Sequence, residues 1–146
     1  MRDLQKIIDA PQESLEIEFK NRLDGLSCNL KKSVLAKEII ALSNHGGGCI
    51  IIGFNDNDSV LTECAPEEGD IDAFNVDSIC SLIQRYVVPA IQVEVHYLQQ
   101  NGSEISHPII VVPGVSRLPL WAARDSPDSG NTLRTNTIYL LSLIHI

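Results

Sequence analysis

A helix-like segment that passes through three glycines into a wholly apolar run limits the fold more than any other part of this sequence. Residues 29–43 place their apolar side chains on one helical face, formed by Leu35, Ile39 and Leu42. After Gly46–Gly48, the run Cys49–Phe54 shows none of the polar alternation of a strand with one wet face. The run therefore predicts a strand buried on both faces of a sheet. Because the connection is short, we expect the helix to pack across that sheet.

Period-two alternation predicts another strand near the N-terminus. Along residues 15–20 apolar side chains alternate with polar ones, so one face of this strand is expected to be buried. The remaining segments indicate a helix at 3–9, a turn at 55–58, an acidic loop to Asp72, a helix at 76–86, a hairpin of strands 93–97 and 108–112, and a last strand at 137–140. This order predicts an α+β fold, a single compact domain with a mixed sheet and helices packed on it.

The length of 146 residues suits one domain with a single sizeable core. The longest apolar run is far shorter than the roughly twenty residues of a membrane span, and no signal-like segment follows Met1. We therefore expect a cytoplasmic protein without membrane contact. The last six residues, Leu141–Ile146, match the translated end of a common sequencing adapter. We expect them to be an artefact, with the domain at 1–140 and a C-terminal domain missing.

The net charge of −8 is unevenly distributed along the chain. Between Glu38 and Gln84 there are eight acidic residues and no lysine or arginine, and the remaining 11 acidic residues balance the 11 basic ones. A basic face is therefore compatible with the acidic total. Five basic residues lie close together in the sequence and are candidate contacts to nucleic-acid phosphates: Lys20, Arg22, Lys31, Lys32 and Lys37.

Two familiar kinds of site are not supported by the spacing of residues. The four cysteines form no CxxC pair, which argues against zinc-ribbon and thioredoxin-type sites, and we expect free thiols. The glycine run follows a helix and precedes a strand, whereas a phosphate-binding loop leads from a strand into a helix. We therefore expect Gly46–Gly48 to end the helix and to pack tightly on the sheet.

Acidic side chains are the candidates for chemistry. Glu16 and Glu18 share the polar face of the first strand, and Glu13 lies just before it. Asp56 follows the buried strand, and Lys20, on the same side as Glu18, could hold a phosphate. A divalent cation such as Mg²⁺ or Mn²⁺ prefers carboxylate oxygens that converge from separate elements. The alternative is that these residues are simply solvated strand and turn side chains.

Two sequence blocks resemble the Schlafen AlbA-like domain family. Residues 13–20, Glu-Ser-Leu-Glu-Ile-Glu-Phe-Lys, resemble its opening E-S-x-x-x-E-F-K. Residues 37–56 are similar to its second block, which reads approximately K-x-I-x-A-x-x-N-x-x-G-G-x-[IL]-x-[IL]-G-[VIF]-x-D. The later strands fit the family in pattern only.

The resemblance implies a compact domain that binds nucleic acid, often in bacterial regulators ahead of a further C-terminal domain. In the ribonucleolytic members, three acids form a metal-dependent site that cuts structured RNA such as tRNA. The matching positions here are Glu13, Glu18 and Asp56, which the resemblance implies as catalytic residues and as ligands of Mg²⁺ or Mn²⁺. The nuclease members build a clamp from two related halves, whereas this chain has one, and its acidic loop would repel phosphates.

Three functions from different classes stay open on the sequence. The first is a nucleic-acid-binding domain, for DNA or RNA, of a regulatory protein such as a transcriptional regulator. The second is a metal-dependent endoribonuclease that acts on structured RNA. The third is a regulatory or interaction domain without nucleic-acid affinity, and homo-oligomerisation is also left open.

Overall fold

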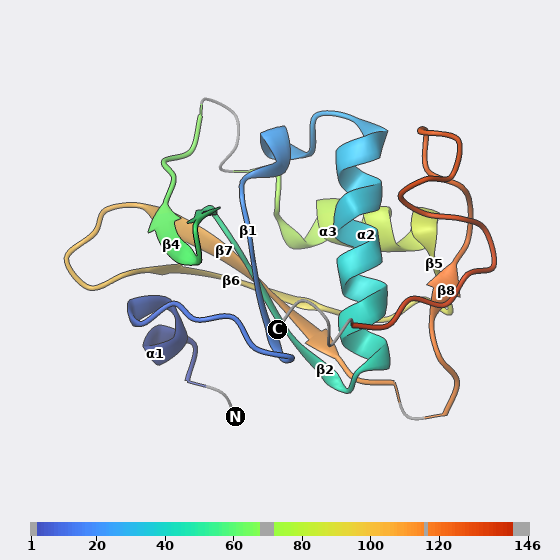
Figure 1. Cartoon of the computed structure of the whole chain (residues 1–146), viewed down its shortest axis with the longest axis horizontal. Helices are drawn as coiled ribbons and strands as arrows, with labels where there is room; N and C mark the ends of the chain where they lie inside the picture. The colour runs from blue at the N-terminus through green and yellow to red at the C-terminus, as the bar shows by residue number, and fades with distance from the viewer. Residues whose placement is uncertain (1–2, 68–71, 116, 142–146) are drawn as a thin grey trace.

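A four-stranded mixed sheet forms the centre of the molecule (Figure 1). The computed structural model describes residues 3–67, 72–115 and 117–141. The strand order is β1-β2-β7-β6, with bounds β1 (Ile17–Lys20), β2 (Gly47–Ile52), β7 (Ser106–Pro113) and β6 (Glu94–Gln99). Strands β1 and β2 are parallel and the other neighbours are antiparallel. The predicted α+β fold with a mixed sheet is confirmed.

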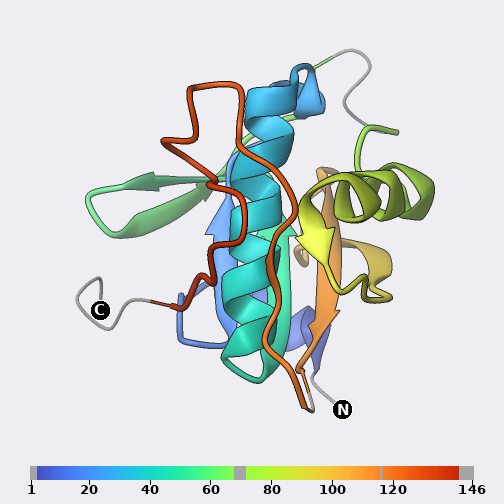
Figure 2. The same ribbon diagram turned by 90° about the vertical axis from the view of Figure 1, so that its right-hand side faces the viewer.

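Helices cover both faces of this sheet (Figures 1 and 2). Helices α2 (Asn29–Asn44) and α3 (Val76–Tyr86) pack on one face, and α1 (Leu4–Asp9) packs on the other. Every residue of β2 is buried, and alternate side chains enter the two cores. Ile50 and Ile52 lie in the core beneath α2, while Cys49 and Ile51 lie in the core beneath α1. The prediction of a strand buried on both faces, with the helix packed across it, is therefore confirmed.

The glycine connection between α2 and β2 is shaped by close backbone packing. Gly46 has a φ of +110°, and Gly47 already belongs to β2. A Cβ on Gly48 would lie 2.1 Å from the carbonyl oxygen of Glu16. The run thus ends the helix and packs tightly against β1, as predicted. The four cysteines, all among the described residues, form no disulfide, also as predicted.

A two-stranded hairpin projects from the sheet after β2 (Figure 2). It consists of β3 (Phe54–Asn57) and β4 (Val60–Glu63), and its turn lies at Asp58 and Ser59, which both have positive φ. The predicted turn at 55–58 is therefore wrong for residues 55–57, which belong to β3, and the predicted acidic loop to Asp72 begins instead with the strand β4. Most side chains of β3 face solvent, so the strand carries no apolar alternation from which it could be predicted.

The C-terminal segment after β7 runs back alongside α2 (Figure 2). It contains the short strand β8 (Trp121–Ala122), which pairs with β5 (Val87–Val88), and is otherwise irregular. The predicted strand at 137–140 is not formed: the backbone pairs with Ala122 only at Asn136 and Thr137, and the carbonyl oxygen of Tyr139 accepts from the side chain of Asn44. Of the six final residues only Leu141 is described, and it packs against the core. The expectation for the other five lies outside the described residues. Within the described part of the chain, no helix has the length and apolar character needed to span a bilayer.

One asparagine attaches the C-terminal segment to α2. The side-chain amide nitrogen of Asn44 donates to the carbonyl oxygens of Leu120 and Tyr139, at 3.0 Å each. Its side-chain oxygen accepts from the backbone nitrogen of Leu120 at 2.7 Å. Asn44 therefore uses its whole amide to hold two distant points of the chain at the end of α2.

Candidate functional site

An open cleft of about 1080 Å³ lies between β1, the residues that precede β1, and α2. We call it the acidic cleft, because four carboxylates line it together with two lysines. The lining also includes Tyr139–Leu141 of the C-terminal segment. The six charged side chains are Glu13, Glu16, Glu18, Glu38, Lys20 and Lys37.

The alternation of β1 sets which of its side chains reach the acidic cleft. Ile17 and Phe19 pack into the core beneath α1, so Glu18 and Lys20 point to the α2 side of the sheet. The Nζ atom of Lys20 lies 3.9 Å from a carboxylate oxygen of Glu18 and 3.0 Å from one of Glu38. The predicted proximity of Lys20 to Glu18 is confirmed, but Lys20 is held by two carboxylates and is only partly accessible to a phosphate.

Two carboxylates of the cleft, Glu18 and Glu13, hold protons more tightly than usual. Burial is the main cause of a rise in the pKa of Glu18 to about 7, and repulsion by Glu38 and Glu13 adds to it. The pKa of Glu13 is also raised, first by burial and then by the charge of Asp56. Burial opposes the charge of Lys20, but attraction to Glu38 and Glu18 outweighs burial and raises the pKa of Lys20. Perturbed carboxyl groups gathered in a cleft are typical of a functional site.

The three acids that match the family motif are close enough to affect one another by charge, but they do not form a set of metal ligands. Asp56 lies on β3 and influences Glu13 by charge, but it is exposed and accepts a hydrogen bond from the Ser59 backbone nitrogen at 3.0 Å. Among the described residues, no three His, Cys, Asp or Glu side chains are placed to hold a metal ion. Carboxylate oxygens suit Mg²⁺ or Mn²⁺ chemically, but this arrangement of Glu13, Glu18 and Asp56 does not fit either ion.

Arg22 was predicted as a phosphate contact, but its side chain is buried and hydrogen-bonded to the backbone of two other segments. Only 7 % of its surface is exposed. Its Nε donates to the carbonyl oxygen of Cys64 at 3.0 Å, and one terminal nitrogen donates to that of Ser106 at 3.2 Å. The guanidinium therefore joins the end of the β3–β4 hairpin to the start of β7 and does not present a cation to a ligand.

The three lysines of α2 have different surroundings. Lys31 forms an ion pair with Asp24 at 3.6 Å. The Nζ atom of Lys37 lies over the ring of Tyr139, 5.0 Å from its centroid, at the acidic cleft. Lys32 lines a second pocket on another side of the helix. All three are half-buried, with the ammonium groups near the surface.

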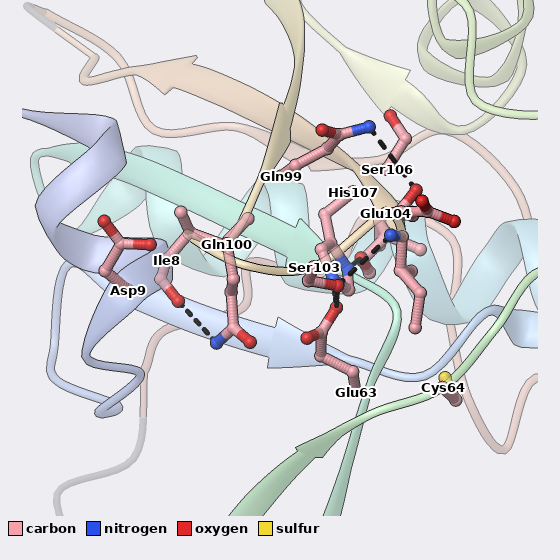
Figure 3. A network of polar contacts seen from close by, with 12 residues as sticks. Ile8, Asp9, Glu63, Cys64, Gln99, Gln100, Ser103, Glu104, Ser106 and His107 are labelled. Atoms are coloured by element: carbon pink, nitrogen blue, oxygen red, sulfur yellow. Dashed lines mark hydrogen bonds and ion pairs between the residues drawn. The ribbon is translucent and has the colours of Figure 1, made fainter.

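A buried histidine fixes the hairpin that carries Asp56. The ring of His107 is fully buried, with Nδ1 2.9 Å from the carbonyl oxygen of Ile52 and Nε2 2.7 Å from a carboxylate oxygen of Glu63 (Figure 3). The same carboxylate oxygen accepts from the Ser103 hydroxyl at 3.0 Å. Both ring nitrogens of His107 thus lie against oxygen atoms, one of β2 and one of β4. The histidine therefore joins β2, β4 and β7.

Glu38 and His107 were not among the residues predicted for the site. The partner of Glu38, Lys20, lies on another element, and nothing in the local pattern of α2 marks Glu38 as part of a site. His107 lies in an apolar strand, where a lone histidine carries no spacing signal.

The fold and the cleft define a class of protein, a single α+β domain with an acid-rich cleft beside its parallel edge strand. The family model described as Schlafen, AlbA_2 matches residues 13–134, so the chain belongs to this family. The solved N-terminal domain of a RecG-related protein from Nitrosomonas europaea is similar, with a TM-score of 0.61 and 21 % identity, over 100 % of this chain and 99 % of that one. The DIP2311 protein from Corynebacterium diphtheriae gives a TM-score of 0.49 and 14 % identity, over 81 % of this chain and 21 % of that one. No curated protein matches the chain.

Proposed function

We propose that this domain binds nucleic acid through the α2 side of its sheet. The observation that carries the proposal is the separation of charge between α2 and the β3–β4 hairpin. Helix α2 has three lysines, and its single acidic residue, Glu38, is ion-paired with Lys20. The hairpin carries Asp56, Asp58 and Glu63 and no basic residue. A phosphate backbone is attracted to the lysines of α2 and repelled by the hairpin and by the carboxylates of the acidic cleft, which gives a bound strand a defined position.

Salt dependence of binding tests this proposal. Short fluorescent DNA and RNA oligonucleotides are titrated with the full chain by anisotropy over a series of salt concentrations. The logarithm of the affinity should fall linearly with the logarithm of the salt concentration, by roughly 0.7–0.9 for each phosphate contacted. The double variant Lys31→Gln/Lys37→Gln should bind more weakly with a shallower slope.

The control is Lys6→Gln on α1, which lies on the opposite face of the sheet and is compared with the single variants Lys31→Gln and Lys37→Gln. It removes one positive charge and should leave binding almost unchanged. Absence of binding to both DNA and RNA would contradict the proposal and favour a regulatory or interaction domain. An equal loss in Lys6→Gln would show that only the total charge matters and not this surface.

A second candidate function is that of a metal-dependent endoribonuclease. It is favoured by the common neighbourhood of Glu13, Glu18 and Asp56, each of which matches the family motif. The candidate requires these carboxylates to approach one another before Mg²⁺ or Mn²⁺ can be held, because the described arrangement does not hold an ion.

Incubation with total tRNA, with and without Mn²⁺, tests the second candidate. Cleavage should require the metal, and Glu18→Gln should abolish it while binding is kept. The control is Glu104→Gln, an exposed acid outside the cleft, which should cut as the parent does. Cleavage by Glu18→Gln at the parental rate would contradict the nuclease function without touching the binding proposal.

A further inference from the structure

A second pocket, of about 450 Å³, lies between η1 (Leu23–Leu26), α2 and α3. It shares no lining residue with the acidic cleft, and none of its described lining residues is acidic. The chain has a net charge of −8, whereas the described lining of this pocket has two cations and no carboxylate. The pocket therefore differs in charge from the chain as a whole. Its polar lining residues are Asn29, Lys32, Ser78, Ser81 and Arg85.

We propose that this pocket binds one phosphate group of the nucleic-acid strand. The inference rests on the proposed nucleic-acid binding and assigns a position to one of the phosphates. Its two cations come from helices that pack against each other, Lys32 from the first turn of α2 and Arg85 from the last turn of α3 (Figure 1). A phosphate between them can therefore be held from two sides.

Both cations are available to a ligand. Lys32 has no ion-pair partner among the described residues, and the nearby carboxylate of Asp24 is paired with Lys31. The guanidinium of Arg85 lies over the ring of Tyr86, 5.5 Å from its centroid, a contact that leaves its edge free to donate. Neither side chain has to break a described ion pair before it contacts a phosphate.

Neutral donors complete the pocket. Ser78, Ser81 and Arg85 recur at helical spacing and are all exposed, so their side chains share one face of α3. The N-terminal end of α2 also lies here, and its N-cap residue, Cys28, makes no side-chain capping bond in the described structure. The partial positive charge of this helix end adds to that of Lys32 and Arg85.

The position of the pocket also gives a bound strand a direction. Lys32 precedes Glu38 of the acidic cleft by six residues on α2, which corresponds to about 9 Å along the helix axis. A strand anchored by one phosphate in the pocket has to pass around α2 as well as along it to reach the cleft, because the two lie on different sides of the helix. Because the pocket lies away from the carboxylates of the cleft, they do not repel the strand where it first contacts the protein.

Two measurements on the full chain test the inference. In nitrogen-15 NMR spectra, inorganic phosphate should shift the signals of Lys32, Ser78, Ser81 and Arg85 in the parent and not in Lys32→Gln/Arg85→Gln. In the oligonucleotide titration, this double variant should lose affinity, and its salt slope should fall by roughly 0.7–0.9, the value for one phosphate. The charge-preserving swap Lys32→Arg/Arg85→Lys should retain most of the parental slope, which separates lost charge from damaged folding.

The outcomes distinguish this inference from the proposed function. If the parent binds oligonucleotides and Lys32→Gln/Arg85→Gln keeps its slope, the pocket is not a phosphate site and the proposed function stands. If inorganic phosphate shifts the pocket signals but no oligonucleotide binds, the pocket takes a free phosphate, and both the nucleic-acid occupant and the proposed function are wrong. If neither ligand binds, both proposals are wrong.

Discussion

Glu18 shows how strongly the fold can change the chemistry of one side chain. In the unfolded chain its carboxyl group ionises near pH 4.5, whereas in the folded chain burial and neighbouring carboxylates raise its pKa to about 7. The folded state therefore binds the proton more tightly. As the pH rises from about 4.5 to about 7, this group lowers the free energy of unfolding.

Replacement of Glu18 by glutamine should remove this cost. We expect Glu18→Gln to be more stable than the parent at pH 8 by about 1–3 kcal/mol and nearly equal to it at pH 4, where both side chains are neutral. Urea unfolding at the two pH values measures the difference. The exposed control Glu104→Gln should show no such dependence, and equal stabilities of Glu18→Gln and parent at pH 8 would contradict the prediction.

The pair of His107 and Glu63 gives a second prediction at the scale of a residue. Glu63→Ala leaves one ring nitrogen of the buried His107 and the Ser103 hydroxyl without their partner. We expect a loss of about 1–3 kcal/mol in the free energy of unfolding, together with faster amide exchange in the β3–β4 hairpin. Urea unfolding and hydrogen exchange check the two parts. If Glu63→Ala were as stable as Glu104→Ala, the pair would not hold the hairpin.

At the scale of elements, the contact of β1 with the glycine connection can be tested at Gly48. A side chain there meets the carbonyl oxygen of Glu16, which accepts a hydrogen bond from the Cys49 backbone nitrogen at 2.9 Å. We expect Gly48→Ala to cost about 2–3 kcal/mol, because the backbones of β1 and β2 must separate. Gly46→Ala is the matched control, since it has open space and only the strain of its positive φ. Thermal unfolding that ranks Gly46→Ala as equally damaging would contradict this reading.

The elements that the sequence predicted correctly carry a clear pattern of apolar residues. Strand β1 alternates with a period of two, helices α2 and α3 place apolar residues at helical spacing, and β2 is a continuous apolar run, so their positions and their packing could be inferred. The β3–β4 hairpin could not, because its polar residues face solvent on both strands. The segment at 137–140 carries a strand-like composition, but among the described residues its backbone pairs with another segment only at Thr137, and Tyr139 is bonded to the side chain of Asn44 instead.

Only part of the candidate site was predictable from the sequence, namely the side chains whose orientation follows from the alternation of β1. Alternation alone places Glu18 and Lys20 together on one face of β1. Glu38 and Arg22 depend on partners that are distant in sequence, Lys20 for the first and the carbonyl groups of Cys64 and Ser106 for the second. A count of charges along the chain cannot show which of them are already paired.

At the scale of the whole molecule, the charge of the acidic cleft should make nucleic-acid binding depend on pH. Between pH 8 and pH 6 Glu18 takes up a proton, because its pKa is about 7. The cleft becomes less negative, so oligonucleotide affinity should rise as the pH falls. Glu18→Gln should already bind at pH 8 about as tightly as the parent does at pH 6. Anisotropy titrations of both at constant salt measure this, and a parental pH profile in Glu18→Gln would contradict it.

The shortness of β1 has a consequence for how this chain can vary in length. Its four residues alternate between the core beneath α1 and the acidic cleft. One residue inserted within β1 would exchange the two sets, exposing Phe19 in the cleft and burying Glu18 and Lys20 among apolar side chains. Two inserted residues would restore the alternation beyond them. A single-residue insertion should therefore be better tolerated at the turn of Asp58 and Ser59, where both residues are exposed, than within β1.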